Sequence, residues 1–317
     1  MKIQFLGTGS GVPAKARNVS SLVLKLLDEI NEIWLFDCGE ATQHQILQTS
    51  IKPRKITNIF ITHMHGDHIF GLPGFLSSRS FQGGGNDPLT IYGPQGIRQF
   101  VQNALRFSKS KLSYPIKFVE LNNEGGQLKF ANGWKIDYLP LNHGVISFGF
   151  RIVEPDSQGE LLIDRLAPYN IPNGPIFGQL KRGETVTLAD GTILNGNDFL
   201  GEEKKGRIVT ILGDTRPCAN LVTLAKGADV LIHEATYVDQ EKDLAYAHFH
   251  STNIQAAKVA KEAQVKKLLM NHISARYLGA DAKKLEKQAK TVFPQAQIVY
   301  DFTEVEVGNH KEMPDEQ

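Results

Sequence analysis

The chain has 317 residues, 41% of them hydrophobic, and its formal net charge is +1. A chain of this length and composition can bury a large core, either as one large domain or as a core with an inserted segment, and belongs to the ordinary soluble globular class. The balanced charge excludes a uniformly basic nucleic-acid-binding chain, so any surface for a polyanion must be a local basic patch.

Cysteine usage and hydropathy indicate where the chain resides. The two cysteines, Cys38 and Cys218, do not suggest a disulfide framework, which favours a reducing compartment. The apolar run at the N-terminus is too short for a signal peptide, and no apolar stretch approaches the length that spans a membrane. We therefore expect a cytoplasmic protein with no membrane partner.

The first segments alternate strands with loops. Residues 2–6 alternate like a strand, and the glycine-rich residues 7–11 interrupt it. This glycine run lacks the G-x-G-x-x-G order and precedes another strand, so we discard a dinucleotide site. The loop at 13–18 carries Lys15 and Arg17 two residues apart. Taken alone, it is a solvated basic turn.

A predicted hairpin follows this loop. The alternating leucines between Leu22 and Leu26 predict a half-buried strand, and residues 33–36 predict its partner. Asp37 comes directly after that partner, either as a turn residue or as a group that orients nearby histidines. Residues 41–49 predict a short helix, in which we interpret His44 as structural.

The run Ile59-Phe60-Ile61 predicts a buried strand, and a histidine-rich motif follows it. His63 and His65 are two residues apart, and alternate side chains of an extended segment point the same way. Both imidazoles can therefore face one metal ion. The alternative is a polar loop that happens to contain several histidines, but four specific residue types at fixed offsets argue against it.

The second half of this motif indicates a second ion. Gly66 lets the backbone turn sharply, so that Asp67 and His68 are aimed differently from the first two histidines. Imidazole nitrogen and carboxylate oxygen suit zinc, whereas the cysteines form no C-x-x-C pair that could build a closed thiolate site. The spacing therefore predicts a dinuclear zinc site.

Alternating helices and strands continue the fold. The patterns predict helices at 72–81 and 97–107 and strands at 89–92, 116–121 and 134–141. The last of these strands leads into His143. A lone histidine is more often structural, but the first ion needs a third nitrogen ligand, and we expect His143 to supply it.

The pattern changes between residues 154 and 206, where strand periodicity is weak and prolines and glycines are frequent. A long segment without regular structure inside a compact domain is either disordered or functional. Its net charge is slightly acidic. Contact with a polyanion would therefore be local, through Lys181, Arg182 and backbone amides freed by the glycines.

Further candidate ligands stand at the ends of later strands. The buried parallel strand predicted at 207–212 leads into Asp214, and the strand at 268–271 leads into His272. Asp214 has two carboxylate oxygens and could bridge two ions. Between these strands we expect a strand at 230–232 and helices at 219–225 and 252–263, the second with Ser251 as its N-cap. We interpret the remaining histidines here as structural: His233 and His248.

These strand ends together predict one site. The first ion is expected on His63, His65 and His143, and the second on Asp67, His68 and His272, with Asp214 between them. Two such ions supply a nucleophile at neutral pH and neutralise the charge that builds on a phosphate, so the site suits phosphodiester hydrolysis. Asp67 can orient the attacking water and accept its proton.

The sequence H-x-H-x-D-H after a strand resembles the signature of metallo-β-lactamase-fold hydrolases. The resemblance implies an α/β fold, a metallo-β-lactamase-like αβ/βα sandwich of two mixed β-sheets flanked by helices, with residues 154–206 as an inserted flexible arm. The catalytic domain would span 1–307. Residues 308–317 are polar, and we expect a disordered tail.

Several segments make the resemblance narrower. The P-x-K-x-R-N loop, the G-P and L-K-x-G elements of the arm, and the segments H-E-A-T and H-S-T resemble the ribonuclease Z family, which trims precursor tRNA. The resemblance implies a homodimeric endoribonuclease with two zinc ions per subunit. It would leave a 3′-hydroxyl on the tRNA and a 5′-phosphate on the trailer. It also places His250, supported by Glu234, near the scissile phosphate, where it can protonate the leaving oxygen.

The same resemblance implies contacts with RNA at two places. The basic loop at 13–18 would lie near the cleavage site, and the arm would grip the elbow of the tRNA. The residues that we expect to contact RNA are Lys15, Arg17, Asn18, Gly174, Pro175, Lys181, Arg182, Thr215 and Arg276.

Three alternatives share parts of this pattern. A hydrolase of another phosphodiester, or of a small ester, thioester or lactam, would share every ligand but would not need the arm. A nuclease of this fold that acts on DNA or messenger RNA would carry a large additional domain, for which the chain has little room. A metal-free RNA-binding relative would have lost ligands, whereas all seven candidates are present.

Overall fold

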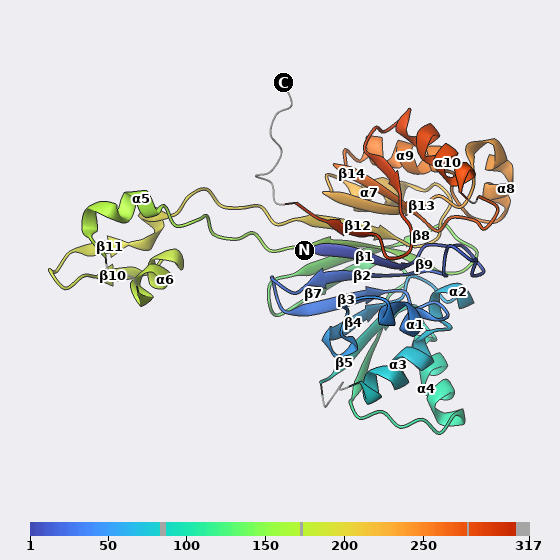
Figure 1. The fold of residues 1–317 in the computed structure, drawn as a ribbon, viewed down its shortest axis with the longest axis horizontal. Coiled ribbons are helices and arrows are strands. Elements are labelled where there is room, and N and C mark those ends of the chain that lie inside the picture. Colours follow the sequence, from blue (N-terminus) through green and yellow to red (C-terminus); the bar gives the residue numbers. More distant parts are fainter. Residues whose placement is uncertain (83–86, 172–173, 278, 309–317) are drawn as a thin grey trace. The chain divides into compact units, whose positions relative to one another are not determined.

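The structure is a computed structural model that describes residues 1–82, 87–171, 174–277 and 279–308. Within these residues the chain forms two compact units (Figure 1). The core unit consists of Met1–Val153 and Ile208–Gly308, and the inserted unit of Glu154–Arg207. The tail predicted at 308–317 falls, from residue 309 onward, outside the described residues.

Two seven-stranded sheets form the centre of the core unit. The order in the first sheet is β16 (Glu304–Glu306), β1 (Lys2–Gly7), β2 (Ser21–Leu26), β3 (Glu32–Phe36), β4 (Ile56–Phe60), β5 (Leu89–Gly93) and β6 (Ile116–Glu120). The order in the second is β15 (Ala296–Ile298), β14 (Lys267–Asn271), β13 (Val230–Glu234), β12 (Ile208–Leu212), β9 (Ser147–Val153), β8 (Lys135–Leu141) and β7 (Gly126–Lys129). Both sheets contain parallel and antiparallel pairs, so the predicted sandwich of mixed sheets is confirmed.

Side-chain alternation explains why the sheets stack. In β2, Leu22, Leu24 and Leu26 pack into the core between the two sheets, whereas Val23 packs on the opposite face, under helices. The alternation had predicted a strand buried on one face, whereas β2 is buried on both. The core between the sheets also holds Trp34, which has no exposed surface and contacts the rings of Phe60 in β4 and of Trp134, directly before β8.

Helices cover the outer face of each sheet (Figure 1). Against the first sheet lie α1 (Thr42–Leu47), α3 (Leu72–Phe81) and α4 (Ile97–Phe107), and against the second α7 (Ala219–Ala225), α9 (Asn253–Glu262) and α10 (Ala280–Lys290). Shorter segments are η1 (Pro53–Lys55), α2 (Gly66–Ile69), η4 (Asp239–Glu241) and α8 (Lys242–Ala247). In the described part of the chain, no helix has both the length and the apolar character needed to cross a membrane.

Most predicted elements of the core unit are confirmed. The bounds of α3, α4 and α7 are those predicted. At Gly66 the chain turns from extended residues into α2, with the His68 N–H donating to the His65 carbonyl at 3.1 Å; a Cβ on Gly66 would lie 2.2 Å from the ring of Phe70, so close packing also explains the glycine. The N-cap of α9 is Thr252, which forms a capping box with Gln255, and not Ser251. The sequence patterns did not indicate β7 or β9.

The inserted unit has a small fold of its own, contrary to the irregular arm that its composition predicted. It contains α5 (Ile163–Leu166), η2 (Ala167–Tyr169), α6 (Pro175–Lys181), β10 (Thr185–Thr187), β11 (Ile193–Asn195) and η3 (Gly196–Phe199). Its buried cluster consists of Leu166, Leu180, Val186, Leu194 and Phe199. At its base the guanidinium of Arg207 donates two hydrogen bonds to the carboxylate of Glu154, at 2.7 and 2.6 Å.

Candidate metal centre

The candidate ligands stand where strands of both sheets end. Five of them follow β4, β8, β12 and β14: His63, His65, His143, Asp214 and His272. Gly213 permits a close approach of two strand ends, because a Cβ on it would lie 2.7 Å from the Cβ of Thr62. The fold thus gathers groups from distant parts of the sequence at one edge of the sandwich.

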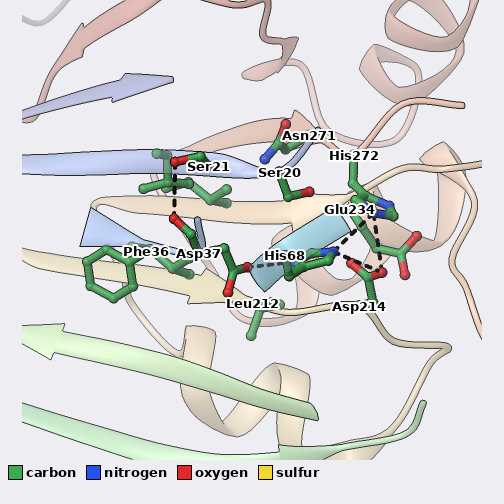
Figure 2. Close-up of a pocket in the computed structure, with 13 residues that line it drawn as sticks. Ser20, Ser21, Phe36, Asp37, His68, Leu212, Asp214, Glu234, Asn271 and His272 are labelled. Atoms are coloured by element: carbon green, nitrogen blue, oxygen red, sulfur yellow. Dashed lines mark hydrogen bonds and ion pairs between the residues drawn. The ribbon is translucent and has the colours of Figure 1, made fainter. Parts of the chain in front are cut away.

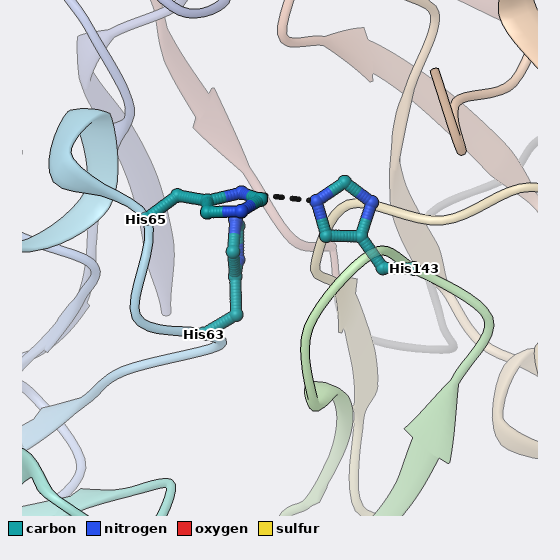
Figure 3. Close-up of side chains that lie close together, drawn as sticks. All are labelled: His63, His65 and His143. Atoms are coloured by element: carbon teal, nitrogen blue, oxygen red, sulfur yellow. Dashed lines mark hydrogen bonds between the residues drawn. The ribbon is translucent and has the colours of Figure 1, made fainter. Parts of the chain in front are cut away.

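The first group of ligands is made by three histidines. His63, His65 and His143 each offer a nitrogen, and these atoms lie within 4.8 Å of one another. His65 Nδ1 and His143 Nε2 are 3.1 Å apart and come from two different loops (Figure 3). His63 is fully buried, whereas the other two are partly exposed. The structure therefore brings together the three residues predicted for one ion.

The second group contains one carboxylate and two histidines. His272 Nε2 lies 3.3 Å from Asp67 Oδ2 and 3.4 Å from His68 Nε2. Asp214 lies between the two groups, since its Oδ2 is 3.6 Å from His63 Nε2, 3.5 Å from His68 Nε2 and 3.3 Å from His272 Nε2. Figure 2 shows His68 and His272 converging on Asp214. The arrangement is the one predicted for a bridging carboxylate.

An enclosed cavity of about 20 Å³ lies beside the second group, between the two sheets (Figure 2). Its lining includes Ser20 and Asn271, whose side-chain oxygens are buried and have no hydrogen-bond partner among the described residues. A cavity of this size holds one water molecule. This cavity is therefore too small to hold a substrate.

Hydrogen bonds of Nδ1 determine which ring nitrogen carries the proton in two histidines. His68 Nδ1 lies 2.7 Å from Asp37 Oδ2, and His143 Nδ1 lies 2.9 Å from the backbone oxygen of Phe249. A carboxylate and a carbonyl only accept hydrogen bonds, so each Nδ1 carries the proton. In the neutral form of each imidazole, Nε2 therefore presents its lone pair toward the centre. Asp37 thus lies where the sequence suggested, orienting a histidine.

Two threonines determine which ring nitrogen carries the proton in two further histidines. The hydroxyl of Thr62 donates to Asp37 at 2.9 Å, so it must accept from His63 Nδ1, also at 2.9 Å. The hydroxyl of Thr236 donates to Glu234 at 2.5 Å and must accept from His272 Nδ1 at 2.9 Å. His63 and His272 therefore also turn unprotonated Nε2 atoms toward the centre.

The charges in the cluster favour a cation. Burial would lower the pKa of His68, but the charges of Asp214 and Asp37 raise it well above its usual range. Burial would likewise raise the pKa of Asp214, but the imidazoles of His272, His68 and His63 hold it well below its usual range. The ionised carboxylates thus attract positive charge, which a metal ion would supply in place of protons.

The donor atoms also have the spacing of a metal site. Ligands bound to one zinc ion at about 2.0–2.1 Å in a tetrahedron are separated by roughly 3.3 Å. The donor pairs reported above lie 3.1 to 3.6 Å apart. Moreover, His63 Nε2 is buried and has no hydrogen-bond partner among the described residues. These residues fit a bound metal. Such an ion would also explain why unprotonated nitrogens face one another.

His250 lies beside the cluster and is held by Glu234. Glu234 Oε1 accepts hydrogen bonds from His250 Nδ1 at 2.9 Å and from the backbone N–H of Thr215 at 2.8 Å. Burial would lower the pKa of His250, but the charge of Glu234 raises it to about 9. His250 Nδ1 is also 4.0 Å from Asp214, but its bond to Glu234 makes it a proton donor in preference to a ligand.

Comparisons with known proteins cover nearly the whole chain. The ribonuclease Z of Lactobacillus helveticus is 62% identical over 307 residues, which are 97% of this chain and 98% of that protein. The ribonuclease Z of Lactobacillus acidophilus is 61% identical over the same shares of both chains. The chain belongs to the ribonuclease Z family.

Two further comparisons concern a solved structure and a family model. The crystal structure of the short form of human tRNase Z matches with a TM-score of 0.70 and 29% identity, over 97% of this chain and 100% of that chain. A family model described as anti-Pycsar protein Apyc1 matches residues 1–150. That match covers less than half of the chain, so the ribonuclease Z relatives decide the family.

The RNA contacts expected from the ribonuclease Z resemblance in the core unit divide into exposed and buried residues. Lys15 is exposed on the loop at 13–18, and Arg276 is exposed and 3.6 Å from Glu241. Asn18 is partly exposed and donates to the backbone oxygen of Glu40 at 2.8 Å. Lys15 and Arg276 can therefore reach a phosphate.

Arg17 and Thr215 were expected to contact RNA, but both are buried. Arg17 is 2% exposed, and its guanidinium donates to Thr8 Oγ1 and to the backbone oxygen of Val299, each at 2.7 Å. Thr215 has no exposed surface. Arg17 was misjudged because an arginine in a basic loop is normally solvated; here it ties the loop to the segment after β15, where its guanidinium also lies 4.4 Å from the centre of the Tyr300 ring.

In the inserted unit, the residues expected to contact RNA lie at one helix. Gly174 and Pro175 begin α6, and the exposed Lys181 ends it. Gly174 and Lys181 line a surface hollow of about 600 Å³. Arg182 follows and forms an ion pair with Glu184 at 2.6 Å.

Sequence reasoning missed the residues that fix the histidine tautomers. Thr62 and Thr236 received no role, although each lies in a motif that was singled out, Thr62 directly before His63 and Thr236 at the end of H-E-A-T. A hydroxyl next to a candidate ligand and a carboxylate at another strand end is the signal that could have found them.

Proposed function

We propose that this protein is a zinc-dependent endoribonuclease that removes the 3′ trailer from precursor tRNA, leaving a 3′-hydroxyl on the tRNA and a 5′-phosphate on the trailer. The observation that supports this most is the convergence of seven metal-binding side chains in a chain 62% identical to a ribonuclease Z. The donor set contains only nitrogen and oxygen, which suits zinc.

Two zinc ions would be shared among these side chains. The first would be held by His63, His65 and His143, the second by Asp67, His68 and His272, with Asp214 shared. When bound, the ions would supply an activated water and neutralise charge on the phosphate. Imidazoles locked by Asp37, Thr62 and Thr236 would keep their lone pairs aimed at the ions.

Asp67 and His250 divide the proton transfers. Asp67 Oδ2 accepts a hydrogen bond from the backbone N–H of Gly11 at 2.8 Å, which fixes the carboxylate beside the cluster. Asp67 would orient the attacking water and accept its proton. Because the pKa of His250 is raised to about 9, its imidazole is doubly protonated at neutral pH: Nδ1 donates to Glu234, and Nε2 carries the proton that would pass to the leaving 3′ oxygen.

The inserted unit would bind the tRNA away from the cleaved bond. Lys181 and Arg182 are exposed at the end of α6, where their cations could contact phosphates. We further propose a homodimer in which the inserted unit of one subunit holds the tRNA cleaved in the other. A cytoplasmic location also stays a prediction.

The test compares two substrates at matched metal content. Labelled precursor tRNA with a 3′ trailer should yield tRNA ending in a 3′-hydroxyl and a trailer with a 5′-phosphate, while bis(p-nitrophenyl) phosphate should be hydrolysed slowly. Elemental analysis should give two zinc ions per subunit. His44→Ala serves as a control, because His44 lies outside the cluster on α1. Hydrolysis of the small ester without cleavage of the precursor would instead indicate a hydrolase of another phosphodiester or small ester.

A further inference from the structure

The loop that carries His250 has a constrained backbone. Phe249, the residue before it, has a φ of 60°, in the left-handed region that residues with a side chain rarely adopt. The Phe249 carbonyl accepts the hydrogen bond from His143 Nδ1 at 2.9 Å, and the next side chain bonds Glu234. This conformation ends α8: the N–H groups of Phe249 and His250 donate to the carbonyls of Tyr246 and Ala245, at 3.2 and 2.8 Å. Side-chain contacts then hold the Phe249 ring.

Arg216 supplies such contacts. Its guanidinium carbon lies 4.4 Å from the centre of the Phe249 ring and 4.3 Å from the centre of the Tyr246 ring. Arginine binds aromatic faces through both its charge and its planar shape. Tyr246 lies near the end of α8, so the guanidinium holds both the end of this helix and the residue before His250.

Arg216 is itself anchored to the loop of a candidate ligand. Its Nε donates to Asn142 Oδ1 at 3.1 Å, and its backbone N–H donates to the Asn142 carbonyl at 2.9 Å. Asn142 directly precedes His143, and Arg216 is two residues beyond Asp214. Three loops, which carry Asp214, His143 and His250, therefore meet at one guanidinium.

We propose that Arg216 is a positioning residue that holds Phe249, and through it the imidazole of His250, in place for protonating the leaving oxygen. This inference rests on the proposed function. A direct contact of the guanidinium with an RNA phosphate is the competing role. The bond from Nε to Asn142 and the contacts with two rings favour positioning, because they fix the guanidinium against the protein.

A double-mutant cycle between Arg216→Ala and His250→Ala tests the proposal, with turnover of precursor tRNA expressed per bound metal ion. Loss of a residue that orients a functional side chain costs roughly 10- to 100-fold in activity. We expect R216A alone to lower kcat by that factor and to change KM by less than about twofold. In the H250A background it should have almost no further effect, because the positioned group is gone.

Conservative variants and a matched control sharpen the result. Arg216→Lys keeps a cation over the rings but loses the planar donor to Asn142, so it should recover part of kcat. Arg106→Ala removes another guanidinium that lies over a ring, 4.6 Å from that of Phe107, on a helix that supplies no candidate site residue, and should leave kcat unchanged. If R216A melts well below the wild type, Arg216→Gln replaces it in the cycle.

Two outcomes would overturn the proposal. Additive losses in the cycle would mean that Arg216 acts independently of His250. A raised KM with a weaker salt dependence and an unchanged kcat would mean that the guanidinium binds phosphate. Cleavage of the precursor by the wild type is measured in the same series, so failure of the proposed function would be seen there and not in the cycle.

Discussion

The core unit and the inserted unit place their charged groups differently. In the core unit, four groups of the metal centre are buried, and three of them commit Nδ1 to a fixed partner: His63, His68 and His272, beside the buried Asp214. In the inserted unit, Arg182 and Glu184 pair with each other at the surface, with side chains 62% and 46% exposed. Buried groups with fixed geometry suit chemistry, and exposed, adaptable charges suit binding to a polyanion.

The largest effect should come from losing a ligand of the core unit. We expect His65→Ala to reduce cleavage of both precursor tRNA and a small phosphodiester to background, because an ion left with two nitrogens is held weakly. Elemental analysis should show less bound metal than in the wild type, whereas His44→Ala should keep it. Wild-type turnover of H65A would contradict the dinuclear reading.

Removing the carboxylate of Asp67 should be almost as severe. We expect Asp67→Ala to lower kcat by roughly 10²- to 10⁴-fold, because the proton acceptor for the attacking water is lost. The affinity for precursor tRNA, measured with a filter-binding assay, should change little, since we expect the carboxylate to act on the water and not on the RNA backbone. An unchanged kcat would remove Asp67 from this role.

Replacing the inserted unit should separate binding from chemistry. With a glycine-serine linker in place of residues 170–184, we expect KM for precursor tRNA to rise at least about tenfold, a loss of about 1.4 kcal/mol. Hydrolysis of bis(p-nitrophenyl) phosphate should stay near wild type. Mixing this variant with H65A should restore some cleavage if one subunit holds the tRNA that the other cuts. Equal loss on both substrates would show that the inserted unit supports the core.

The smallest effect is expected from a single cation of the inserted unit. Lys181→Ala should raise KM for precursor tRNA a few-fold. It should also reduce the slope of the logarithm of the binding constant against the logarithm of the salt concentration by about one, as expected for one lost phosphate contact. Lys205→Ala is the matched control, because Lys205 is exposed in the same unit and is paired with Asp156 at 2.7 Å. Identical behaviour of the two variants would argue against a specific role for α6.

The same contrast explains what the sequence could predict. The ligands were predictable because a metal requires particular residue types, and because strands place them at one edge; His143 and His272 were found by recurrence of a histidine after a strand. Arg17 was misplaced because a basic loop gives no sign that its guanidinium turns inward. The threonine partners were missed because their roles depend on which hydroxyl donates to which carboxylate, a property of the folded geometry alone.

The inserted unit was misjudged for a related reason. Its elements are short, and its buried cluster draws single residues from five separate places, among them Leu166, Val186 and Phe199. Periodicity needs several turns or alternations to be visible, so a fold of this size leaves little pattern. The frequent glycines and prolines indicated the boundary at residue 154, but they also led to the prediction of an irregular segment after it.

The ion pair between Glu154 and Arg207 has a consequence for how this enzyme family can change. The chain leaves the second sheet after Val153 and returns at Ile208, and these two residues are register partners in β9 and β12. Because an ion pair and a strand pairing hold the two ends of the inserted unit together, doubling the length of this unit would add only roughly 0.6 kcal/mol of loop-closure cost. Insertions and deletions can therefore accumulate between these two residues while the strand that delivers Asp214 keeps its register, so substrate reach can evolve without disturbing catalysis.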